Sequence, residues 1–274
     1  MDTHILQEKF ERMGARLKIG AIDRRRWNTA GREISINILK DNKGEYFDVT
    51  TDPSRTFRID ALDVRPKDRH LLLMVAAERD SAHPVAGEKQ KFLCGHDERS
   101  WFVAAVPGAN VSNVVTAMEA LKPADVRDSQ ARNKVKAAHR NLRKNRGFVR
   151  QGEWFFIPAA LHVDRQLVLN DEPLRRGNGG KAHWAEFAFR HGGETVYVND
   201  RHPNGLTIGQ FAQMYGNRAA ARAGFRIMQR NATVYVKGRI SHPDHKTIVL
   251  SSWHRVAMNT ENLAPAMRHV AFLD

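Results

Sequence analysis

Residues 123–158 read PADVRDSQARNKVKAAHRNLRKNRGFVRQGEWFFIP, and the rest of the chain is most simply interpreted as support for this stretch. Pro123 suits the first turn of a helix, and Gly147 suits a helix end. The sequence therefore predicts a helix over residues 124–145, followed at once by a strand that carries three consecutive aromatic residues, 154–156.

The predicted helix is strongly basic. Nine Lys or Arg residues lie between Ala124 and Arg150, with only two acids, Asp125 and Asp128. Both acids fall near the N-terminal end, where the helix dipole favours negative charge. The apolar positions at helical spacing form a narrow seam: Ala131, Val135, Ala138 and Leu142. Such a helix is expected to dock by one edge and to expose a broad cationic surface that attracts phosphates.

The flanking segments predict antiparallel strands. Alternating apolar residues and short turns give about six strands over residues 33–107, in a meander or small barrel. A helix is predicted over 3–14 and another over 110–121, capped by Asn110 or Ser112. After the basic helix come the strand 148–157, turned near Gly152, a hairpin over 183–200, a helix over 206–216, and strands to the C-terminus.

The fold class predicted from this order is α+β, with two antiparallel β-rich lobes joined by a helical segment. The expected parts are an N-terminal lobe at 1–121, a basic connecting helix at 122–146, and a C-terminal lobe at 147–274. With 42% hydrophobic residues, the 274-residue chain can build a core for each.

The charge balance points to a polyanionic partner. The formal net charge is +14 and the pI is about 10.3. Such a balance is typical of proteins that bind RNA or DNA. The chain has one cysteine, Cys94, which excludes an intramolecular disulfide. No apolar run is long enough to cross a membrane, and the N-terminus lacks the features of a signal peptide, so we expect a cytoplasmic protein with no membrane partner.

Phosphate contacts are predicted from the cations and base stacking from the aromatic residues. Aromatic side chains on strands beside arginines suit unstacked bases, which favours RNA over DNA. The predicted nucleic-acid contacts are Arg24, Arg25, Arg26, Arg132, Lys134, Lys136, Arg140, Arg143, Lys144, Arg146, Arg150, Trp154, Arg175, Arg176, Trp253 and Arg255.

The stretch RISHPDHKTIVLSSWHRV, residues 239–256, places several histidines close together. His242 and His245 flank a Pro-Asp turn, and His254 follows on the returning strand. These histidines can be exposed turn and edge residues, a metal-independent acid–base pair that cleaves RNA, or, with Asp244, a metal site. Because the spacing HxxH in a tight turn is a poor chelate, we expect no metal. The sequence also lacks a glycine-rich motif for nucleotide binding, so we expect no cofactor.

These observations together predict an RNA-binding component of a ribonucleoprotein, which can contact other protein subunits. The alternative is a metal-independent, His-dependent endoribonuclease whose catalytic residues come from His242, His245 or His254. A DNA-binding or structural, capsid-like basic protein is the second alternative.

Overall fold

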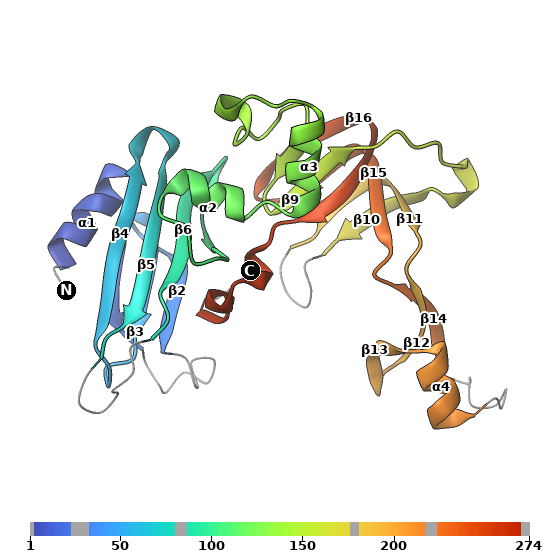
Figure 1. Ribbon diagram of the computed structural model, residues 1–274, viewed down its shortest axis with the longest axis horizontal. Helices are drawn as coiled ribbons and strands as arrows, with labels where there is room; N and C mark the ends of the chain where they lie inside the picture. The colour runs from blue at the N-terminus through green and yellow to red at the C-terminus, as the bar shows by residue number, and fades with distance from the viewer. Residues whose placement is uncertain (1–2, 23–32, 80–86, 176–180, 217–223, 270–274) are drawn as a thin grey trace.

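The computed structural model describes residues 3–22, 33–79, 87–175, 181–216 and 224–269. Within them lie four sheets and several short helices, a mixed, sheet-rich architecture in which the sheets are mainly antiparallel (Figure 1). The predicted mixed α and β composition with several antiparallel sheets is confirmed. In the described residues, no helix is both long enough and apolar enough to span a membrane.

The first sheet is three-stranded, in the order β1-β3-β2, and is preceded by helix α1. Its elements are α1 (Thr3–Arg12), β1 (Leu17–Ala21), β2 (Ile34–Asp41) and β3 (Gly44–Thr51). The strands β2 and β3 form the predicted hairpin, whereas β1 pairs in parallel with β3. Helix α1 buries Leu6 and Phe10, and Met13 just after it is also buried, whereas Ile5 is 49% exposed.

The second sheet is an antiparallel meander in the order β4-β5-β6-β7. Its strands are β4 (Phe57–Arg65), β5 (His70–Ala77), β6 (Gln90–Asp97) and β7 (Ser100–Ala105). One core joins both sheets through buried residues such as Phe47, Leu73 and Phe92. Ala264 and Ala266, near the C-terminus, belong to the same core, so the end of the chain returns to the N-terminal sheets.

Helix α2 (Val114–Ala120) covers the other face of this meander, where Leu72 and Leu93 pack against it. Its cap is Asn113, whose side chain accepts from the Thr116 amide, rather than the predicted Asn110 or Ser112. Asn113 has an extended backbone at the N-cap position, and its side-chain oxygen pairs with an amide of the first helical turn that would otherwise have no partner.

The predicted helix over 124–145 is wrong in its length. Helix α3 (Ala124–Arg132) ends early, and residues 133–148 are irregular apart from the short turn η3 (Ala137–His139). The helix closes on Lys134, which has φ 49°, while the amides of Lys134 and Val135 bond back to Ala131 and Gln130. This pattern is a Schellman stop. Of the predicted apolar seam only Val135 is buried, and Leu142 is 52% exposed.

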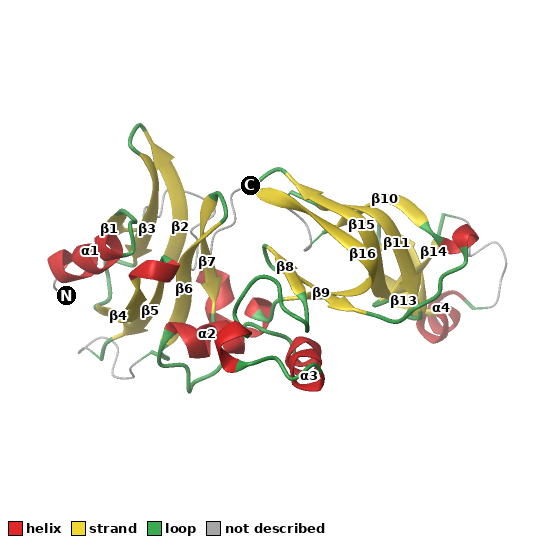
Figure 2. Cartoon of the chain, turned by 90° about the horizontal axis from the view of Figure 1, so that it is seen from above, coloured by secondary structure: helices red, strands yellow, loops and turns green. Residues whose placement is uncertain are grey.

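The third sheet has six antiparallel strands in the order β10-β11-β15-β16-β9-β8. Its strands are β8 (Val149–Gln151), β9 (Trp154–Pro158), β10 (Leu169–Leu174), β11 (His183–His191), β15 (Thr233–His242) and β16 (His245–Met258). Figure 2 shows this sheet beside the N-terminal sheets, with α2 and α3 along one side. Helix α3 packs on it through Val126, against Phe148 and Phe155.

The predicted hairpin over 183–200 is wrong. Strand β11 ends in the six-stranded sheet, and the chain then enters a fourth sheet in the order β13-β12-β14. This sheet contains β12 (Glu194–Asn199), β13 (His202–Thr207) and β14 (Arg226–Arg230), with helix α4 (Ile208–Tyr215) following β13. Gly192 and Gly193 join the sheets with φ of 68° and 93°, values that glycine adopts without strain. Figure 1 shows this small sheet projecting away from the N-terminal sheets.

Candidate functional site

Residues 132–146, here called the cationic segment, carry the densest group of exposed positive charge in the predicted site. No Asp or Glu occurs between Asp128 and Glu153. Six cations of the segment are exposed, and within the described residues none of them pairs with a carboxylate: Arg132, Lys134, Lys136, Arg140, Lys144 and Arg146. Their charge is therefore available to an external anion.

Buried polar residues fix the backbone of the cationic segment. Lys122 is 3% exposed, and its ammonium group donates hydrogen bonds to the Arg140 carbonyl at 2.9 Å and to the Glu119 carboxylate at 2.7 Å. The Gln130 amide donates to the same carbonyl at 2.7 Å. Burial lowers the pKa of Lys122, while the bond to Glu119 opposes that shift. The segment is thus an ordered irregular loop held from beneath, and it keeps its shape without a helix.

Two of the predicted phosphate contacts turn inward instead. Arg143 pairs with Asp97 and Glu98, and Arg150 pairs with Asp97 at 3.3 Å. These ion pairs connect the β6–β7 turn of the meander with the residues leading into the six-stranded sheet. Burial lowers the pKa of both arginines to about 10, so both stay cationic near neutral pH. Their charge is neutralised within the protein.

The predicted aromatic contacts also divide by burial. Trp154 is 8% exposed and packs in the core of the six-stranded sheet, which leaves almost no ring surface for a base. Trp253 is half-buried, and the neighbouring Arg255 pairs with Asp125 at 2.5 Å. Trp184, on β11, is 44% exposed and offers more surface than either.

Of the remaining predicted cations, Arg175 is exposed at the end of β10. Arg24, Arg25, Arg26 and Arg176 lie outside the described residues.

The structure brings two of the three predicted histidines together and places the third elsewhere. His242 and His245 face each other across the β15–β16 turn, as predicted. His254 lies nine positions farther along β16, roughly 25–30 Å away for an extended strand. The third ring is His183, at the start of β11, where Trp184 pairs with Ser241 and so places His183 beside His242. No local pattern predicts this neighbour, because the register between β11 and β15 joins residues far apart in the chain.

The three rings lie in close contact. The ring centroids of His183 and His242 are 4.1 Å apart, those of His242 and His245 are 4.7 Å apart, and those of His183 and His245 are 5.3 Å apart. One ring nitrogen of each histidine lies within 4.8 Å of one from each of the others. We call these three residues the histidine cluster.

His183 and one nitrogen of His245 are buried without a hydrogen bond, whereas His242 keeps contacts with neighbouring backbone groups. His183 is 1% exposed, and both of its ring nitrogens are buried without a hydrogen bond, as is Nδ1 of His245. Burial is the main cause that lowers the pKa of His183 to about 3 and that of His245 to about 4, and His242 adds to both shifts. These two histidines are therefore neutral near pH 7 and poor proton donors. The structure brings together His242 and His245 of the three predicted histidines, but not His254.

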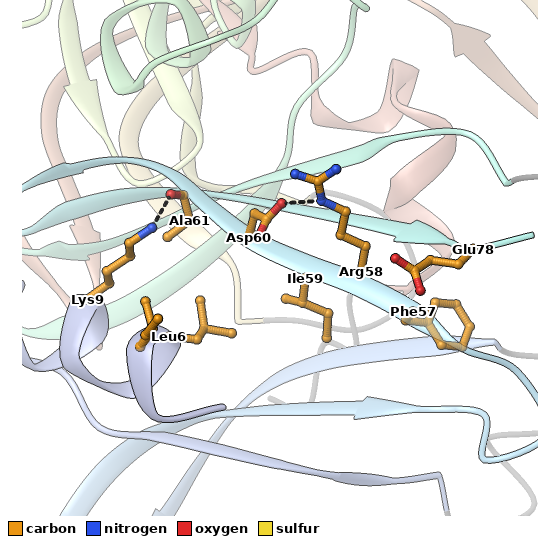
Figure 3. A pocket seen from close by; sticks show the side chains of 9 residues that line it. Leu6, Lys9, Phe57, Arg58, Ile59, Asp60, Ala61 and Glu78 are labelled. Carbon is orange, nitrogen blue, oxygen red and sulfur yellow. Dashed lines mark hydrogen bonds and ion pairs between the residues drawn. The ribbon is translucent and has the colours of Figure 1, made fainter. Parts of the chain in front are cut away.

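A pocket of about 390 Å³ lies elsewhere, between α1 and β4 (Figure 3). Three of its charged side chains already pair within the protein: Lys9 donates to the Ala61 carbonyl at 3.0 Å, and Arg58 pairs with Asp60 at 2.6 Å. Its lining offers no cluster of catalytic or metal-binding side chains.

Comparison with known proteins gave no match to a family model, to a curated protein or to a solved structure.

Proposed function

We propose that the protein binds RNA through the cationic segment, as a component of a cytoplasmic ribonucleoprotein. The observation that carries the proposal is the group of six exposed cations that have no carboxylate partner among the described residues, on a backbone held by Lys122 and Gln130. Because the segment is already ordered, binding loses less conformational entropy than it would for a flexible basic tail.

The shape of the segment supports RNA over duplex DNA. Sequence-specific reading of a duplex normally places a helix in the major groove. Here the helix ends at Arg132, so most of the exposed cations lie on an irregular loop instead. Such a loop can follow the phosphates of a folded or single-stranded RNA, and the exposed ring of Trp184 can stack on an unpaired base.

The salt dependence of binding tests the proposal. With single-stranded RNA, six phosphate contacts predict a slope of about −4 for the logarithm of affinity against the logarithm of salt concentration. Replacing three of the six, in the variant R132Q/K136Q/K144Q, is expected to reduce the slope to about −2. The measurement is fluorescence anisotropy of a labelled single-stranded RNA, with a DNA duplex of the same sequence in parallel and EDTA in the buffer.

A matched control separates this surface from net charge. The variant K40Q/K67Q/K89Q removes the same charge from exposed lysines of the N-terminal sheets and their loops. It is expected to keep a slope near that of the natural sequence. If both triple variants weaken binding equally, the cationic segment is not the binding surface, and the proposal is wrong. Tighter binding of the duplex than of the RNA would contradict the preference for RNA.

A further inference from the structure

We propose that His183, His242 and His245 bind one divalent transition-metal ion of the zinc class. This inference departs from the expectation of no metal, which rested on the HxxH spacing alone. The third ligand comes from a strand distant in the sequence, and three imidazoles are a ligand set that zinc accepts in proteins.

The scaffold under the three rings is rigid. They stand at one level on three adjacent strands, β11, β15 and β16, whose backbones are bonded in a continuous antiparallel ladder. Ligands about 2.0–2.1 Å from a tetrahedral zinc ion lie roughly 3.3 Å from one another. The ring nitrogens lie within 4.8 Å, so rotation of the side chains, without a change in strand pairing, brings them to that separation.

Unpaired buried nitrogen is the observation that points to a ligand. Both nitrogens of His183 are buried and lack a partner, although buried polar atoms in folded proteins nearly always have one. A neutral imidazole carries a lone pair on one nitrogen, and a metal ion would use it. Stacking of the rings explains their packing but leaves these atoms without a bond.

The surroundings leave room for the ion and supply an outer carboxylate. Gly152, in the β8–β9 turn, lies against His245, and a Cβ there would stand 2.7 Å from Nε2. Glu98 places an oxygen 4.0 Å from Nδ1 of His245. A carboxylate beside the second ring nitrogen is a common partner of metal-bound histidine, because it fixes the ring orientation. With three protein ligands, the fourth position is open to water.

His242 can exchange its present contacts for a metal. Its Nδ1 accepts from the Asp244 amide at 3.1 Å, and its Nε2 lies 3.3 Å from the Lys181 carbonyl. Both contacts are at the turn of the β15–β16 hairpin, where water can replace them. The thiol Cys94 is buried in the N-terminal core and does not join the site.

The test is a titration of the full chain after treatment with EDTA and removal of the chelator. We expect one equivalent of Zn²⁺ to bind by calorimetry, Co²⁺ to give the visible spectrum of a tetrahedral nitrogen site, and Zn²⁺ to raise the melting temperature. The variants H242Q and H245Q are expected to lose more than the roughly 10–100-fold in affinity that removal of an outer partner costs. The control H162Q changes an exposed histidine outside the cluster and is expected to bind like the natural sequence.

Two results would overturn the proposal: no stoichiometric binding of Zn²⁺ or Co²⁺, or equal affinity for H242Q, H245Q and H162Q. His242 is half-buried at a strand end, so circular dichroism of H242Q is expected to show a retained fold. Since RNA binding is measured in EDTA, the outcome for the metal site does not depend on the outcome for the cationic segment.

Discussion

Asp97 is the residue whose loss should most weaken the connection between the meander and the six-stranded sheet. Its carboxylate is the shared partner of Arg143 and Arg150, and its side chain is only 9% exposed. The change Asp97→Asn keeps the shape of the side chain but removes the charge. It leaves Arg150, which is 20% exposed, without a counter-charge in a largely dry environment.

The expected cost follows from what each arginine retains. Breaking a buried ion pair by removing one partner typically costs about 3–5 kcal/mol. Arg143 is 35% exposed and still pairs with Glu98, so most of the loss comes from Arg150. We therefore expect about 3 kcal/mol in the free energy of unfolding, which is roughly a 6–12 °C fall in melting temperature for a protein of this size.

Thermal and urea unfolding would measure this loss, with Asp60→Asn as the control. Asp60 pairs with Arg58 on the surface, where both side chains are well exposed, so its loss should cost less than about 1 kcal/mol. The double variant D97N/R150M removes the stranded cation as well and is expected to be more stable than D97N. A D97N protein within 1 kcal/mol of the natural one, or a double variant less stable than D97N, would refute the reasoning.

Three further predictions concern the core of the meander. Gly95→Ala should cost about 1–3 kcal/mol in urea unfolding, because its Cβ would stand 2.7 Å from the His70 ring and 2.8 Å from that of Phe102. Burial, reinforced by the charge of Arg150, lowers the pKa of His70. As the pH falls below about 6.5, His70 becomes protonated in the unfolded state but stays neutral in the folded state, so the free energy of unfolding should decrease on acidification. The decrease should be smaller in the variant His70→Gln. Cys94 is fully buried, and burial raises its thiol pKa, so a thiol reagent should modify it only as fast as the protein unfolds.

Local hairpins could be predicted from the sequence because both strands and their turn are neighbours in the chain. Alternating apolar residues and short turns predict antiparallel neighbours over residues 33–107 and across the turn between His242 and His245, and the structure pairs β2 with β3, β4 with β5 and β15 with β16. The pairing of His242 with His245 across their turn could be predicted for the same reason. Six of the predicted cations in residues 132–146 are exposed, because charged side chains mostly lie at the surface.

Features set by distant contacts could not be predicted in this way. The stop at Lys134 lacks the glycine that usually marks a Schellman motif, so nothing in the local pattern distinguished a short helix from a long one. The inward turn of Arg150 depends on Asp97, fifty-three positions earlier. Likewise, the placement of His183 depends on which strand lies beside β15, and that is a property of the whole sheet.

Glu98 lies between the two proposed sites and bears on how they can be separated. One of its oxygens pairs with Arg143, in the cationic segment, and the other accepts from the Lys246 amide at 2.5 Å and faces His245. A change at Glu98 would therefore disturb the loop and the histidine cluster together, and a defect in either activity could not be assigned. Substitutions at Lys136 and at His242 avoid this shared carboxylate. If the two sites are physically separate, a substitution at Lys136 should weaken RNA binding and leave metal binding unchanged. A substitution at His242 should weaken metal binding and leave RNA binding unchanged.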